Sequence, residues 1–379
     1  MRRVGPAPGV ALAALLVLPG CAGAGGEGDY AWDLPSNFPT PQVPEDNPMS
    51  VAKVELGRRL FYDPRLSLNE TQSCGSCHLQ ELAFTDGRPQ GIGSTGEVHP
   101  RSSMSLANVA YVPRLTWANP LIDTLEEQAL GPLFGEDPVE LGMAGQEEEL
   151  FRRLREDPDY PMWFEEAFPR DPDPIGLQNL LRALAAFQRT LISADSPFDR
   201  FARGDATAMS ESAQRGADLF FSERLECFHC HGGFNFSDAL RHDGTIQDQV
   251  AFHNNGLYNV DGRGGYPPPN TGVFAISTDL RDMGRFRAPT LRNIEVTAPY
   301  FHDGSAATLD DVIDHYAAGG RTIEEGPNAG VGAESPLKSI FVNGFELTPE
   351  EREDLLAFLR SLTDETFLTD PRFRDPFLE

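Results

Sequence analysis

The chain has 379 residues, with 58 aspartates and glutamates against 31 lysines and arginines, and a formal net charge of -27. Such a charge repels nucleic acid, which we exclude as a partner, and it favours basic partners through long-range attraction. The alternative is that the negative charge serves only to keep the protein soluble. The length suits two domains.

The N-terminus has the pattern of an export signal. A short basic segment precedes an apolar core over residues 10–18 that is too short to span a bilayer stably. Leu18-Pro-Gly-Cys21 resembles a bacterial lipoprotein cleavage box with Cys21 as the lipidated residue, although Pro19 is unusual there and ordinary cleavage near residues 22–24 is the alternative. We predict a signal peptide over residues 1–21 and a periplasmic protein that meets the outer or inner membrane only through a lipid anchor.

The next segments predict a linker and then helices. Gly-rich residues 22–28 and Pro-rich residues 35–48 predict a flexible tether over 22–47. Apolar residues share one face over 50–62, which predicts a helix, and 175–191 predicts a strongly apolar helix at a domain junction. A helix over 210–221 precedes a Cys-x-x-Cys-His motif, as the helix over 50–62 does, which is a weak internal repeat.

Those two motifs account for every cysteine after residue 21. Each offers two thiols for thioether bonds to haem vinyl groups and a histidine as axial iron ligand. A zinc site from two Cys-x-x-Cys pairs is the alternative, but it does not need the histidine that directly follows each second cysteine. We predict two covalently bound c-type haems, held by Cys74, Cys77 and His78 and by Cys227, Cys230 and His231.

The remaining signals predict a mainly α protein. Thr308 to Asp311 and Thr348 to Glu351 fit helix capping boxes, and Gly262 to Thr271 is a Gly- and Pro-rich loop. Short helices and long loops with little sheet suit a c-type cytochrome domain, in which the haem itself fills much of the core. Because the motifs are 153 residues apart, we predict two cytochrome c-like domains, over 48–204 and 205–379, with one haem each.

From about Pro48 the chain resembles the bacterial di-haem cytochrome c peroxidases, in which two cytochrome c-like domains face each other across a calcium site. It is most similar to the branch with the di-haem enzymes that mature methylamine dehydrogenase and those of methanobactin gene clusters. The shared landmarks are the two motifs, Ala83–Arg88, Met104–Tyr111, Trp117, Asp123–Pro132, Pro138–Glu140, Ala288–Asn293 and Thr297–Gly304. The resemblance implies that the N-terminal haem is the peroxidatic one.

Two departures separate this chain from the respiratory members. Their second haem carries a methionine 14 residues after the histidine that corresponds to His302, and that position is Tyr316 here. A phenolate stabilises ferric and higher states, whereas a thioether stabilises ferrous iron. We predict Tyr316 as the distal ligand; His315 is the rival, and only one of two adjacent helical residues can face the iron.

The second departure concerns the first haem. Respiratory members carry a distal histidine eight residues before an Arg-Asn pair; here the pair is Arg101-Ser102 and the position is Ser94. His99 is near in sequence, but a His-Pro loop is more often exposed. We predict an iron on His78 that is open to peroxide.

The resemblance also implies catalytic and calcium-binding residues. Glu140 matches the distal glutamate, a general acid and base for breaking the O–O bond, with Gln128 beside it. Trp117 matches the tryptophan between the haems, although a lone tryptophan is usually core packing. Calcium would be held by Thr297 and Pro299 carbonyls and by Ser102, which replaces an asparagine and weakens that expectation.

These predictions together describe a haem-dependent oxidoreductase. Hydrogen peroxide would form a high-valent di-haem state, which would oxidise a partner protein, at a residue such as tryptophan, by long-range electron transfer. The alternative is a respiratory cytochrome c peroxidase that reduces peroxide to water with electrons from a small cytochrome c or cupredoxin. A plain electron carrier is a third class, but it would need two six-coordinate irons.

Overall fold

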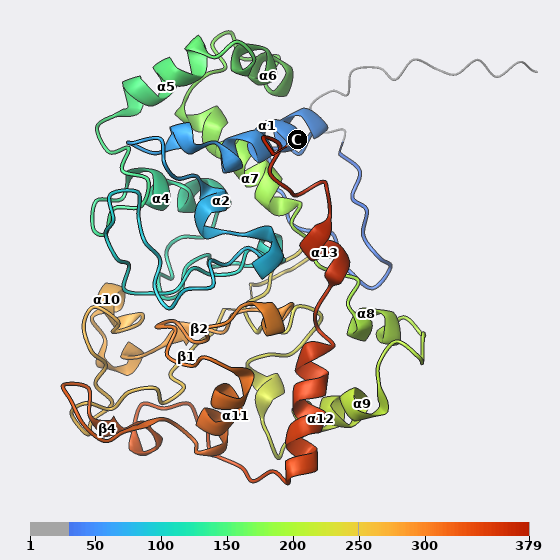
Figure 1. Ribbon diagram of the computed structural model, residues 1–379, viewed down its shortest axis with the longest axis vertical. Helices are drawn as coiled ribbons and strands as arrows, with labels where there is room; N and C mark the ends of the chain where they lie inside the picture. Colours follow the sequence, from blue (N-terminus) through green and yellow to red (C-terminus); the bar gives the residue numbers. More distant parts are fainter. Residues whose placement is uncertain (1–29, 249, 379) are drawn as a thin grey trace, which may run out of the picture.

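The computed structural model describes residues 30–248 and 250–378 (Figure 1). The predicted signal peptide and Cys21 lie outside these residues. Within the described part of the chain, no helix combines the length and the hydropathy needed to cross a bilayer.

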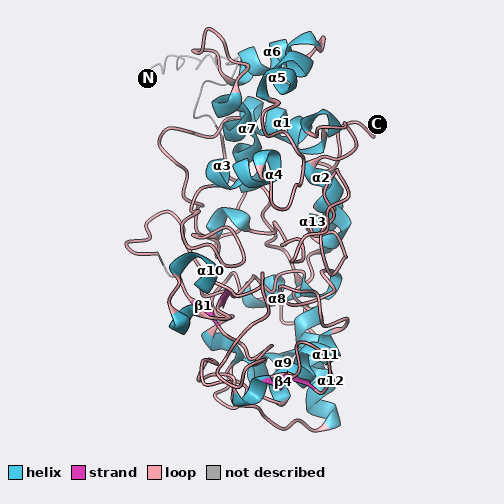
Figure 2. Ribbon diagram, turned by 90° about the vertical axis from the view of Figure 1, so that its left-hand side faces the viewer, coloured by secondary structure: helices cyan, strands magenta, loops and turns pink. Residues whose placement is uncertain are grey.

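The described chain is mainly helical with long loops and little sheet, as predicted (Figure 2). Two small antiparallel pairs make up the sheets: β1 (Phe252–His253) with β2 (Phe286–Arg287), and β3 (Thr322–Ile323) with β4 (Gly330–Val331). The longer helices are α1 (Val51–Tyr62), α5 (Glu147–Glu156), α6 (Tyr160–Ala167), α7 (Leu177–Arg189), α9 (Glu211–Phe220), α11 (Leu309–Ala317) and α12 (Pro349–Arg360). The shorter ones are α2 (Cys74–Cys77), α3 (Leu125–Gln128), α4 (Leu130–Phe134), α8 (Pro197–Ala202), α10 (Phe274–Ser277) and α13 (Glu365–Thr369).

The predicted helices are present, with ends set by the capping residues. The Ser50 hydroxyl accepts a hydrogen bond from the Lys53 amide at the start of α1. Thr308 begins α11 and Thr348 begins α12, each in a capping box with the acid three residues later. These caps satisfy amides that would otherwise lack partners in the first helical turn.

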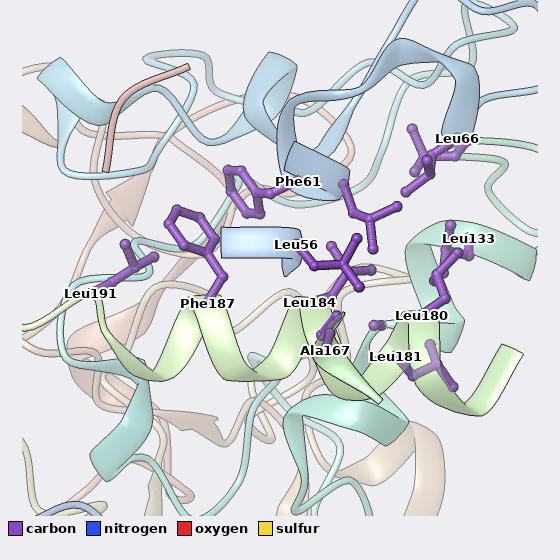
Figure 3. Close-up of a cluster of buried hydrophobic side chains, with 14 of the residues drawn as sticks. Leu56, Phe61, Leu66, Leu133, Ala167, Leu180, Leu181, Leu184, Phe187 and Leu191 are labelled. Atoms are coloured by element: carbon purple, nitrogen blue, oxygen red, sulfur yellow. The ribbon is translucent and has the colours of Figure 1, made fainter. Parts of the chain in front are cut away.

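Two hydrophobic cores lie one above the other along the long axis (Figure 1). In the first, α1 packs on α7, with Leu56 and Phe61 against Leu184 and Phe187 (Figure 3). In the second, α9 packs on α12. The chain then returns, because Phe367 of α13 belongs to the first core. The predicted division into domains 48–204 and 205–379 therefore did not anticipate that α13 would pack in the first core.

The predicted tether differs from expectation where the structure describes it. Phe38 is buried against Tyr111 and Phe234, and the Tyr111 hydroxyl donates to the Pro39 carbonyl at 2.7 Å. Asn47 is also buried and donates to Glu126 at 2.6 Å. Proline and glycine content suggested a flexible segment, but one aromatic and one amide side chain anchor residues 38–47 to the protein.

A glycine allows close helix contact in each core. A Cβ atom at Gly57 would lie 1.9 Å from the Ala183 carbonyl oxygen of α7, and one at Gly216 would lie 1.9 Å from the Asp354 carbonyl oxygen of α12. Since both obstacles are backbone, neither can rotate away. The helix before each Cys-x-x-Cys-His motif is therefore seated on its partner through a residue without a side chain.

Gly216→Ala is expected to lower the free energy of unfolding by about 1–3 kcal/mol, because α9 must move away from α12. Gly131→Ala is the matched control, since a Cβ atom there meets nothing within 4 Å. Denaturant unfolding of the holoprotein, followed by circular dichroism, measures both. Equal stability of the two variants would show that the α9–α12 contact is not tight.

Candidate active site

The first motif lies on α2 and presents its histidine to a cavity. His78 Nδ1 is 2.7 Å from the Phe84 carbonyl oxygen, so Nδ1 carries the proton and Nε2 is left as the free donor atom. Ala83 and Phe84 have φ values of 51° and 62°, and this tight loop brings that carbonyl back to the ring. Burial lowers the pKa of His78. The imidazole is therefore held neutral and oriented, as a metal ligand must be.

The second motif has the same local construction. His231 Nδ1 is 3.2 Å from the Phe236 carbonyl oxygen, and Phe236 has a φ of 48°. Burial lowers the pKa of His231 as well. The weak internal repeat of the sequence thus extends to the hydrogen bond that orients each histidine.

Each motif lines its own cavity. The first cavity contains Cys74, Cys77 and His78 in its wall. The second contains Cys227, Cys230 and His231. Both cysteines and the histidine of each motif thus border one space, as haem attachment requires.

Each cavity also has an arginine in its wall that forms no ion pair with a carboxylate of the described residues. Arg287 is buried in the wall of the second, where its guanidinium donates to the Thr116 carbonyl and the Met104 sulfur. Arg101 lines the first and donates to the Asn270 side chain. No carboxylate among the described residues lies within 4.0 Å of either guanidinium, and burial lowers the pKa of both, that of Arg287 to about 10. Because a buried unpaired charge is costly, these sites fit haem propionates.

Arg287→Gln is expected to lower the reduction potential of the haem on His231. Without this arginine, the negative charge of a propionate would be uncompensated. Its interaction with the haem iron, at roughly 10 Å, is about 1–2 kcal/mol, or on the order of 50 mV. Arg285→Gln is the control, because that side chain is 43% exposed and pairs with Asp282. Redox titration of both variants measures the effect, and equal shifts would contradict the assignment.

Glu140 and Gln128 line the same cavity as the first motif, and their catalytic role stays a prediction. Burial raises the pKa of Glu140, and a charge on His99 would lower it. His99 Nδ1 lies 3.8 Å from Glu140 Oε1, and 45% of the glutamate side chain is exposed. The site therefore pairs a carboxyl of raised proton affinity with an imidazole.

Ser94 and His99 differ in their relation to this cavity. The Ser94 amide donates to the Glu140 carbonyl at 2.7 Å, and its side chain is not in the wall. His99 is in the wall, with Nε2 buried and without a hydrogen-bond partner. The sequence favoured an exposed His99, whereas in the structure its side chain is only 16% exposed. Its amide donates to the Gly91 carbonyl at 2.8 Å.

In the second cavity the structure brings Tyr316, and not His315, into the wall. His315 is buried with Nε2 2.9 Å from the Asn255 carbonyl oxygen. Burial raises the pKa of Tyr316. Tyr316 is thus the residue of this pair that borders the second cavity, while its role as ligand stays a prediction.

Trp117 lies in the wall of both cavities. Its indole Nε1 donates to the Ser102 carbonyl at 2.9 Å, and the Ser102 amide and hydroxyl bond the His302 and Phe301 carbonyls. These bonds fix the indole between the two halves. The position suits the predicted relay, which stays a prediction.

The predicted calcium ligands Ser102, Thr297 and Pro299 all lie in the wall of the second cavity. They offer neutral carbonyl and hydroxyl oxygens, which calcium accepts together with water. The calcium site stays a prediction, and we derive no step from calcium.

Two cavities, each lined by a Cys-x-x-Cys-His motif and separated by one tryptophan, place the chain in the class of di-haem c-type proteins. The sequence model of the di-haem cytochrome c peroxidases matches residues 51–207. The chain belongs to the di-haem cytochrome c peroxidase family. It is a haem-dependent oxidoreductase, as predicted, and the family implies two c-type haems.

Three relatives illustrate the range of that family. The methylamine utilization protein MauG of Methylorubrum extorquens is 34% identical over 333 residues, which are 87% of this chain and 83% of that protein. The cytochrome c551 peroxidase of Pseudomonas aeruginosa is 31% identical over 331 residues, again 87% and 83%. A crystal structure of a MauG-like protein associated with microbial copper homeostasis is 53% identical, has a TM-score of 0.90, and covers 92% of this chain and 99% of that one.

Proposed function

We propose that the protein uses hydrogen peroxide to oxidise a partner protein by electron transfer across its own structure. The observation that carries this proposal is the inequality of the two cavities. Glu140 and Gln128 face the first, whereas Tyr316 faces the second, and Trp117 borders both. A simple electron carrier would not need an acid–base pair beside one site only.

The haems, when bound, supply iron that reacts with peroxide and retains oxidising equivalents. Glu140 can take the proton of bound peroxide on Oε1 and return it to the departing oxygen. Gln128 offers an amide to orient peroxide, and Tyr316 keeps it out of the second cavity. Trp117 then links the cavities for electrons that return from the protein surface.

Two similarities support a protein as the substrate rather than peroxide removal alone. The chain has Tyr316 in place of the respiratory methionine, and the 53% identical structure is described as MauG-like and associated with microbial copper homeostasis. We extend that association to this protein's partner and keep tryptophan as the expected target. We also propose that the protein lies in the periplasm and is attached to a membrane by a lipid anchor at Cys21.

Absorption and electron paramagnetic resonance spectra of the ferric holoprotein, before and after peroxide, test this function. We expect one high-spin and one low-spin haem, and a long-lived oxidised form without prior reduction. Co-purified partner protein should then gain oxygen, detected by mass spectrometry.

Two low-spin haems, or a reaction only after one-electron reduction, would favour the respiratory type instead. His99→Ala then identifies the cause. If His99 occupies the first iron, the substitution converts that haem to high spin.

A further inference from the structure

An apolar cluster leads from Trp117 toward the surface of the C-terminal half. Its aromatic members include Trp117, Tyr258, Tyr266 and Phe286. Figure 1 shows β1 and β2, which frame this cluster, between the two halves on the side of α10. Of the three tryptophans in the chain, Trp117 alone borders the two cavities.

The rings form a continuous series of contacts. The Trp117 and His302 ring centroids are 6.4 Å apart, His302 and Tyr266 are also 6.4 Å apart, and Tyr266 and Tyr258 are 5.3 Å apart. His302 is held by a stacked contact of 3.7 Å with Phe286. Tryptophan and tyrosine are the readily oxidised rings of this series, so Trp117, Tyr266 and Tyr258 are its stations.

The two tyrosines differ in what can receive a proton. A phenol becomes a stable neutral radical only if its proton leaves with the electron. The Tyr266 hydroxyl faces the Asn254 amide oxygen at 3.0 Å and accepts the Leu257 amide, and neither group is a base. The Tyr258 hydroxyl donates to Asp303 Oδ2 at 2.7 Å, and a carboxylate is a base.

Tyr258 is also the outer member of the pair. Tyr266 is buried, at 3% exposure, whereas Tyr258 is only partly buried. Arg321 covers the Tyr258 ring at 4.5 Å and lies 3.4 Å from Asp303. This cation limits the proton affinity of Asp303, which favours return of the proton once an electron arrives.

We propose that Tyr258, with Asp303 as its proton acceptor, is the site at which oxidising equivalents leave the protein for its partner. This inference rests on the proposed function. One electron passes from Tyr258 through Tyr266 and Trp117 to the peroxide-oxidised cofactors, which are reduced by one electron. The phenolic proton moves to Asp303, and an electron from the partner later reverses both changes at Tyr258.

Radical trapping tests the proposal without the partner. Holoprotein is treated with peroxide and a nitroso spin trap, and the tryptic peptides are analysed by mass spectrometry. Peptide 242–263 contains Tyr258 as its only tyrosine and no tryptophan, and peptide 264–281 contains Tyr266 in the same way. We expect the adduct on 242–263, its loss in Tyr258→Phe, and its loss or displacement to 264–281 in Asp303→Asn.

Tyr160→Phe is the matched control. Tyr160 donates to Asp63 at 2.7 Å with Arg65 beside its ring at 5.2 Å, but it lies in the first core and outside the cluster. The adduct should be unchanged in this variant. A normal haem spectral response to peroxide with no adduct at Tyr258, or with an unchanged adduct in Asp303→Asn, would overturn the inference and leave the proposed function standing. A wild-type protein without any haem response to peroxide would overturn both.

Discussion

Glu140→Gln is expected to slow the reaction of the ferric holoprotein with peroxide by about 10²-fold or more, the range ascribed to a positioned general acid–base. The amide keeps the size of the side chain but can no longer accept the peroxide proton. Stopped-flow absorption of the haem at increasing peroxide concentration gives the second-order rate constant. Binding of the haems, checked by the reduced spectrum, should be unchanged.

Glu136→Gln is the control for charge. Glu136 is an exposed acid of the same loop and is not in the cavity wall, so its rate should match the wild type. An equal loss in both variants would attribute the effect to net charge and not to acid–base chemistry.

The pH profile gives a second measure of the same group. Burial raises the pKa of Glu140, so the basic carboxylate form should appear above the ordinary glutamate range and the rate should rise with pH through that pKa. The charge on a protonated His99 lowers the pKa of Glu140. His99→Gln should therefore move the ascending limb to higher pH, because that opposing charge is gone.

The haem-attachment residues were predictable from motifs, since covalent attachment needs two closely spaced cysteines and a histidine. Glu140, Trp117 and Tyr316 lie on the cavities only through loops that close over long sequence distances, and their placement came from resemblance. His99 lies in a short hairpin that is closed by backbone bonds between Gly91 and Arg101 and between Gly93 and Glu97. The sequence did not show which way a side chain of this hairpin would point.

The fold was likewise predictable where local sequence determines it and not where long-range contacts do. Helices with caps and apolar faces, such as α1 and α12, were predictable because their signals lie within about a dozen residues. The return of α13 was not, since Gln80 binds the Phe367 carbonyl at 3.1 Å across 287 residues of chain. The unpaired Arg287 was equally hidden, because an arginine in a sequence gives no sign of lacking an acid.

Tyr316→Phe is expected to convert the haem on His231 from low spin to high spin, because the phenyl ring offers no oxygen to the iron. The lifetime of the peroxide-oxidised form should fall by about tenfold or more, which corresponds to ~1.4 kcal/mol of lost stabilisation. Electron paramagnetic resonance of the ferric protein measures the first effect, and the decay of the absorption change measures the second. Tyr316→Met should instead keep the haem low spin and raise its potential, since a thioether favours ferrous iron.

Tyr300→Phe separates ligation from the loss of a phenol in the same cavity. Tyr300 also lines the second cavity, but its hydroxyl donates to the Ile294 carbonyl at 3.0 Å. Its removal should leave the spin state unchanged. If Tyr316→Phe also left the low-spin signal intact, His315 would become the candidate. It would first have to break its bond to the Asn255 carbonyl, so His315→Ala would then abolish that signal. The spin states of these variants thus decide which residue of α11 closes the second haem.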